Sequence, residues 1–146
     1  MIINGKTVYC READRKVLEA FFSGETCKGK LSVRDRVAVR MDNSAYYQLW
    51  NTELVRRYAD GEIWIYITDN SDMDNVYYSW RGRCREVAMT QTTKNRLNAF
   101  LEYLGFNSLE VHSSKKLFGV WHNGTELKNN TWYKLDKDTK SLVEIE

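Results

Sequence analysis

The sequence lacks proline altogether and contains only two histidines. Proteins contain about 5% proline on average, so its absence excludes a stiff proline-rich linker or ligand segment. His112 and His122 are too few for an ordinary zinc site, and no cysteine lies at ligand spacing from either of them. We therefore expect no metal and no cofactor.

Cysteine is scarce as well, and long apolar runs are absent. Cys10, Cys27 and Cys84 are odd in number and show no Cys-x-x-Cys spacing, which favours reduced thiols in a cytoplasmic protein. The first residues, 1–6, are too polar for a signal peptide, and no apolar stretch is long enough to cross a membrane. We expect a cytoplasmic protein that does not bind membranes.

Neither sign of charge dominates the chain. Its 22 basic and 20 acidic residues give a formal net charge of +2, which is neither the basic excess of a dedicated DNA-binding protein nor the acidic excess of a DNA mimic. Electrostatic binding must therefore come from a local patch. The chain also has no glycine-rich phosphate loop, no G-x-S-x-G and no H-E-x-x-H motif. We expect a protein that is not an enzyme. An enzyme with an unrecognised catalytic site is a third hypothesis, after the two binding functions given below.

The clearest local signal is a helix over about residues 93–104. Its apolar residues recur at i, i+3, i+4 and i+7, which places them on one helical face; they are Leu97, Phe100, Leu101 and Leu104. Thr92 or Thr93 can cap the start of this helix. Gly105 can end it, because glycine adopts the left-handed conformation without steric cost.

The rest of the chain predicts one more helix and many short strands. Residues 11–22 form an amphipathic pattern that ends at Ser23-Gly24, and Asn4-Gly5 is a strong hairpin signal. Alternating apolar residues and frequent turn residues favour an antiparallel sheet. Ile63, Ile65 and Ile67 alternate with aromatic residues, so this strand is expected inside the sheet. The 146 residues are predicted to form a single α+β domain, residues 1–146, with a mainly antiparallel sheet and two helices.

Residues 45–101 resemble a short uncharacterised domain of small bacteriophage and plasmid proteins. The shared pattern has an aromatic-Leu strand, an apolar strand, a tryptophan and a Thr-Thr helix start. Here it consists of Tyr47-Gln48-Leu49-Trp50-Asn51-Thr52, Glu62-Ile63-Trp64-Ile65, Trp80 and Thr90 to Phe100. The resemblance implies an origin in a mobile element and assigns no activity, and the segments 1–44 and 106–146 lie outside it.

An arginine stripe is the main candidate contact site. Arg81, Arg83 and Arg85 recur at period two, so on one strand they share a face, and Tyr77 continues that face if the strand is unbroken. Arginine next to aromatic residues suits phosphates or acidic protein surfaces, because the guanidinium donates paired hydrogen bonds and can stack. Arg36, Arg40, Lys94 and Arg96 extend this patch if the strand order permits. The alternative is a solvated face whose arginines pair with nearby acidic residues.

Together these observations predict a protein that works by binding. Small phage accessory proteins often act on host nucleic-acid or defence machinery, and we expect an inhibitor of the anti-CRISPR type with a host protein as its partner. The alternative is direct nucleic-acid binding through the arginine and aromatic strand face.

Overall fold

The computed structural model describes residues 2–69, 77–80 and 83–145 of the chain. Its largest element is a seven-stranded sheet in the order β14-β13-β7-β6-β5-β4-β3, and every pair of neighbours is antiparallel. These strands are β3 (Cys27–Lys30), β4 (Asp35–Val39), β5 (Ala45–Leu49), β6 (Thr52–Arg57), β7 (Ile63–Ile67), β13 (Thr131–Asp136) and β14 (Ser141–Glu144). With two helices added, the α+β prediction is confirmed.

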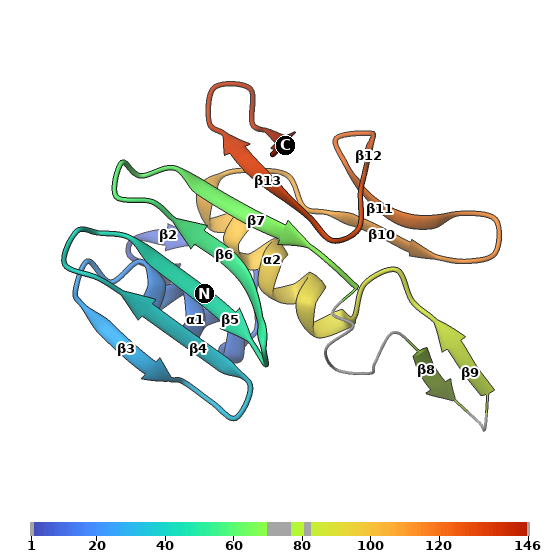
Figure 1. The fold of residues 1–146 in the computed structure, drawn as a ribbon, viewed down its shortest axis with the longest axis horizontal. Coiled ribbons are helices and arrows are strands. Elements are labelled where there is room, and N and C mark those ends of the chain that lie inside the picture. Colours follow the sequence, from blue (N-terminus) through green and yellow to red (C-terminus); the bar gives the residue numbers. More distant parts are fainter. Residues whose placement is uncertain (1, 70–76, 81–82, 146) are drawn as a thin grey trace.

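Two helices lie behind this sheet, on one of its faces (Figure 1). The first, α1, spans Glu12–Phe21, close to the predicted range of 11–22. The second, α2, spans Gln91–Leu104 and starts two residues before the predicted range of 93–104. Its N-cap is Thr90, whose hydroxyl lies 2.9 Å from that of Thr93, so the predicted cap was placed too late. Gly105 ends the helix with φ +82°, as predicted.

Smaller sheets complete the fold. The Asn4-Gly5 hairpin joins β1 (Ile2–Ile3) to β2 (Lys6–Thr7), and both turn residues have positive φ, which explains the Asn-Gly sequence. A three-stranded sheet contains β10 (Glu110–Ser113), β11 (Phe118–His122) and β12 (Thr125–Leu127). The pair β8 (Tyr77–Trp80) and β9 (Arg83–Glu86) forms a separate two-stranded sheet. Within the described residues, neither helix has the length and apolar character needed to cross a membrane.

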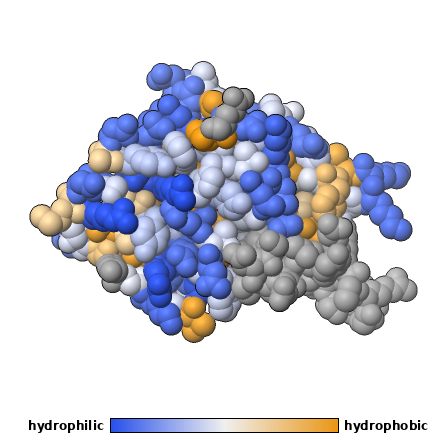
Figure 2. Space-filling model, in the orientation of Figure 1, coloured by the Kyte–Doolittle hydropathy of each residue, from blue (hydrophilic) through white to orange (hydrophobic). Residues whose placement is uncertain are grey.

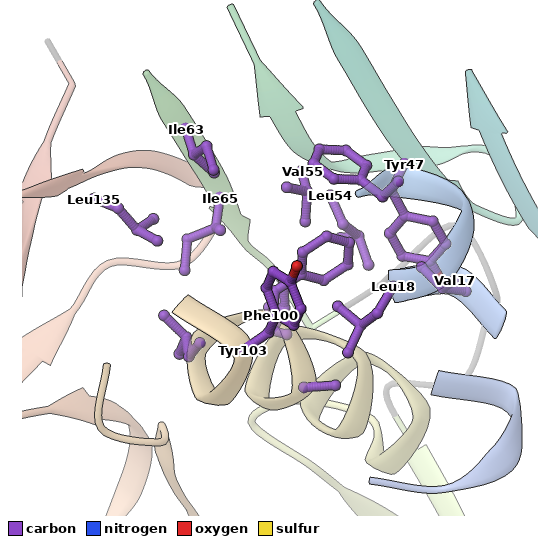
Figure 3. Packing of buried hydrophobic residues seen from close by; sticks show 14 of the residues in the cluster. Val17, Leu18, Tyr47, Leu54, Val55, Ile63, Ile65, Phe100, Tyr103 and Leu135 are labelled. Carbon is purple, nitrogen blue, oxygen red and sulfur yellow. The ribbon is translucent and has the colours of Figure 1, made fainter. Parts of the chain in front are cut away.

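The core lies between the helices and the inner face of the large sheet. Figure 3 shows side chains of both helices converging on those of the sheet strands, with Phe100 at the centre. Leu97, Phe100 and Leu101 are fully buried, as predicted, and Leu104 is half-buried against the same core. Three polar residues of α2 are half-buried: Lys94, Asn95 and Glu102.

A β-bulge adds to this core. Tyr47 pairs with Val55 and Gln48 with Glu53, so Leu54 has no partner on β5. An extra residue in one strand interrupts the strict alternation of side chains. As a result, the neighbours Leu54 and Val55 are both completely buried.

The central position of Leu101 leads to a first prediction. Leu101→Ala removes a fully buried side chain and should lower the free energy of unfolding by about 2–5 kcal/mol, because a cavity remains. Leu104→Ala, at a half-buried position, should cost less. Urea denaturation of both variants checks this, and an equal loss at the two positions would contradict the burial of α2 described above.

Candidate binding face

The predicted arginine stripe does not lie on one unbroken strand. Tyr77 belongs to β8 and Arg83 and Arg85 belong to β9, and the two strands run antiparallel. Arg83 pairs with Trp80 and Arg85 with Tyr78, so the condition of one unbroken strand, on which the place of Tyr77 beside the arginines depended, is not met. Arg81 lies outside the described residues. A contact role for these residues remains a prediction.

Arg96 is in the interior, away from the predicted contact patch. Only 3% of it is exposed. Its guanidinium donates two parallel hydrogen bonds of 3.0 Å to the carboxylate of Asp35 on β4, and a third of 2.5 Å to Asp14 on α1. The hydroxyl of Tyr47 on β5 donates to the same Asp35 carboxylate at 2.5 Å. These four residues, which we call the Arg96 network, join both helices to the sheet.

Electrostatics explain how the Asp35 carboxylate remains charged in the core. Burial raises the pKa of Asp35, but hydrogen bonds from Arg96 and Tyr47 outweigh this effect, so that its pKa is lowered overall. Burial and the adjacent Asp35 charge raise the pKa of Tyr47, which keeps its proton and remains a donor. Because each charge depends on its partners, the Arg96 network is a structural element, and Arg96 is unavailable for contacts with a partner molecule.

A second arginine, Arg57 on β6, is also buried, with 8% of it exposed. It donates hydrogen bonds to the backbone carbonyl groups of Phe21 at 3.0 Å and Asn43 at 2.8 Å. Phe21 is the last residue of α1, so the cation lies at the negative end of that helix. Burial lowers the pKa of Arg57.

The face of the large sheet opposite the helices, here called the outer face, carries a different set of residues. Figure 2 views this side of the molecule, where blue hydrophilic residues surround paler residues of intermediate hydropathy. Arg56 on β6 pairs with Tyr46 on β5 and with Trp64 on β7, and Trp64 pairs in turn with Lys134 on β13. Paired residues in an antiparallel sheet point to the same side. Cations and aromatic rings therefore alternate along one row of the outer face.

Four aromatic residues gather on this face: Tyr58, Trp64, Tyr66 and Trp132, here called the aromatic cluster. The ring centroids of Tyr66 and Trp132 are 5.0 Å apart, those of Tyr58 and Trp64 are 4.8 Å apart, and those of the two tryptophans are 6.5 Å apart. Arg56 places its guanidinium carbon 4.2 Å from the centre of the Trp132 ring. The three residues on strands are half-buried and Tyr58 is 37% exposed, so their rings remain accessible.

Part of this cluster comes from β7, the strand that carries apolar or aromatic residues on both of its sides. Apolar or aromatic residues on both sides of Ile63–Ile67 predicted an interior strand, and β7 does lie between β6 and β13. Both helices, however, pack on the isoleucine side. Trp64 and Tyr66 therefore line the outer face.

Acidic residues accompany the cluster. Glu53 forms an ion pair with Arg56 at 2.6 Å. Glu62 accepts a hydrogen bond from the Trp64 indole at 2.6 Å and pairs with Lys134 at 3.4 Å. Much of the positive charge around the aromatic cluster is therefore compensated by the protein itself.

Two further polar side chains, those of Asn98 and His122, have structural roles. Asn98, in the middle of α2, accepts a hydrogen bond of 2.8 Å from the backbone N–H of Leu109, which fixes the segment after the helix. His122 is buried, and its Nε2 lies 2.9 Å from the carbonyl oxygen of Asn107.

Cys10 and Cys27 are free thiols. Among the residues that the structure describes, no group of three or more His, Cys, Asp or Glu side chains is arranged to hold a metal ion.

Comparison with known proteins finds no matching family model, no matching curated protein and no matching solved structure.

The Arg96 network gives a second prediction. Arg96→Met leaves the buried carboxylates of Asp14 and Asp35 without their cation, and should lower the free energy of unfolding by about 3–5 kcal/mol. Lys16→Met removes an exposed cation from α1 and should change the free energy of unfolding by less than about 0.5 kcal/mol. Urea denaturation measures both, and similar values for the two variants would show that the network is not structural.

The lowered pKa of Asp35 gives a third. Its folded-state pKa lies below the ordinary value of 3.8, so its contribution to stability is fully present above that pH and is lost as the pH falls through the folded-state pKa. We expect the loss of stability under acid to be smaller in Asp35→Asn than in the wild type. Urea denaturation at pH 7, 5 and 3 tests this, with Glu25→Gln as an exposed control that should follow the wild type.

Proposed function

We propose that this protein acts without catalysis, by binding a partner protein through the aromatic cluster on the outer face of its sheet. The observation that carries the proposal is the cluster itself, with Arg56 stacked 4.2 Å from the Trp132 ring on the side away from both helices. Tryptophan, tyrosine and arginine are the residues enriched among those that dominate binding energy at protein interfaces.

The geometry of the rings favours a protein over a nucleic acid at this cluster. Stacking of successive bases requires open ring faces along a positive groove. Here the rings tilt against one another by 40° to 59°, and Arg56 covers one face of Trp132. Glu53 and Glu62 also place negative charge where phosphates would lie. A protein surface with apolar and polar groups fits this arrangement better.

The kind of partner proposed here is an inference from the mobile-element origin that the resemblance implies. On that basis we propose an accessory protein of a phage or plasmid that inhibits host nucleic-acid or defence machinery in the host cytoplasm, in the manner of anti-CRISPR proteins. Arg81, Arg83, Arg85, Tyr77 and Lys94 are proposed as further contacts. The alternative remains direct nucleic-acid binding by the arginines of β9 (Arg83–Glu86).

The fourth prediction compares capture of host proteins by matched variants. Tagged wild-type protein should retain a specific host protein after nuclease treatment. Trp132→Ala and Arg56→Glu should each weaken this binding by about 2 kcal/mol or more, as is typical of central interface residues. Phe118→Ala, which removes an exposed aromatic ring from β11, serves as the control and should bind like the wild type.

Thermal melts establish that each variant is folded before binding is compared. Retention that disappears with nuclease, or equal binding by all variants, would refute the proposal. Direct nucleic-acid binding would be favoured if the protein binds labelled oligonucleotides tightly and in a salt-sensitive way. The double variant Arg83→Ala with Arg85→Ala should then lose this binding.

A further inference from the structure

A depression of about 240 Å³ lies at one end of the outer face, apart from the aromatic cluster. It is bordered by the loop between β3 and β4 and by the turn between β5 and β6. The side chains that matter here are Lys30, Arg34, Arg36, Gln48 and Trp50, all of which line it. The three cations are exposed.

Two of the cations in this depression lie directly opposite each other in the sheet. Lys30 and Arg36 are direct partners across β3 and β4, and Arg36 is the partner of Gln48 across β4 and β5. Like charges opposite each other in a sheet are destabilising. Among the described residues that line the depression, Asp35 supplies the only carboxylate, and it is already bonded to Arg96, Tyr47 and Ser32. Uncompensated positive charge on a concave surface attracts an anion.

Trp50 provides a second, independent observation. Its φ is +55°, which is a rare conformation for a bulky residue. Glycine or asparagine would occupy this position of a hairpin turn with less strain. The conformation is held by a hydrogen bond of 2.7 Å from the Trp50 N–H to the Arg34 carbonyl, and by one of 2.8 Å from the Gln48 side chain to the Trp50 carbonyl. Strain that the surroundings maintain in this way is concentrated at functional positions.

Hydrogen bonds join the base of the depression to the core. The Ser32 hydroxyl donates a hydrogen bond of 2.9 Å to Asp35 and accepts one of 3.0 Å from the Asp35 N–H, which ties the β3–β4 loop to the Arg96 network. The two loops are joined through Arg34 and Trp50. These bonds fix the backbone of both loops, from which the cationic side chains and the indole project into the depression.

We propose that this depression binds a nucleotide unit, with its phosphate between Lys30, Arg34 and Arg36 and its base against Trp50. A terminal phosphate carries about two negative charges near neutral pH and several acceptor oxygens, whereas a carboxylate of an acidic peptide carries one and would leave more of the three cations unpaired. An indole beside a cationic patch is the arrangement that binds single nucleotides of a strand by stacking. The nucleotide is either free or part of a single strand. This site shares no residue with the aromatic cluster.

The test is titration of the full chain with adenosine 5′-monophosphate and with a 5′-phosphorylated single-stranded oligonucleotide, monitored by calorimetry and by the NMR signal of the Trp50 indole. We expect saturable binding to at least one of them, with the Trp50 signal shifting. Trp50→Gly and Lys30→Ala with Arg36→Ala should each weaken binding by about tenfold or more. Lys115→Ala with Lys116→Ala removes the same charge from exposed positions elsewhere and should leave it unchanged.

Thermal melts establish that the variants are folded before binding is compared. Trp50→Gly relieves the positive φ but also removes a side chain of which only 37% is exposed, so its weaker binding is counted only if the variant melts cooperatively. Should this variant fail to fold, the double substitution of Lys30 and Arg36, which removes the like-charge pair, carries the test alone.

The remaining outcomes are decisive. Binding of the oligonucleotide alone, dependent on Trp50, identifies a strand as the source of the nucleotide, and binding of the monophosphate identifies a free one. The proposal would be overturned if neither the monophosphate nor the oligonucleotide binds at millimolar concentration. It would also be overturned if inorganic phosphate binds equally well, or if an acidic peptide displaces the bound nucleotide. Trp132→Ala should leave nucleotide binding intact, so failure here and failure of the proposed protein interface are distinguishable.

Discussion

The buried guanidinium of Arg96 is the interaction on which the rest of the structure depends. It joins α2 to Asp14 on α1 and to Asp35 on β4, and Tyr47 on β5 completes the set. Transfer of these charges out of water is expensive, and the paired hydrogen bonds to Asp35 compensate only while the geometry is kept. Apolar packing alone would tolerate small shifts of the helices on the sheet. The Arg96 network requires one arrangement of both helices.

That arrangement decides which surface is free for binding. With α1 and α2 held on the inner face, the residues that alternate with the core residues are left on the outer face (Figure 1). Ile63, Ile65 and Ile67 pack beneath the helices while Trp64 and Tyr66 gather with Trp132 on the other side. The burial of one side of β7 and the availability of the other are therefore consequences of the same strand alternation.

The outer face has two chemically different parts. Around the aromatic cluster, Glu53 and Glu62 compensate Arg56 and Lys134, and the rings pack on one another. At the other end, Lys30 and Arg36 oppose each other and Trp50 is held at positive φ. Asp35 links this second part to the core, because its carboxylate bonds both Arg96 and Ser32. Removal of the core network is therefore expected to disturb the depression more than the aromatic cluster.

The sequence by itself determined the features that depend on neighbouring residues. The spacing of Leu97, Phe100 and Leu101, the left-handed Gly105 and the Asn4-Gly5 turn follow from local sterics and periodicity, and each appears in the structure. Tertiary structure decided the rest. Arg96 lies 61 positions from Asp35 and 82 from Asp14, so no local pattern distinguishes it from an exposed arginine. Whether Trp64 faces a core or solvent depends on which side the helices cover, and the Lys30–Arg36 pair depends on strand register. The first arises from contacts between segments far apart in the chain, and the second from the register of the β3–β4 hairpin. One-dimensional periodicity contains neither.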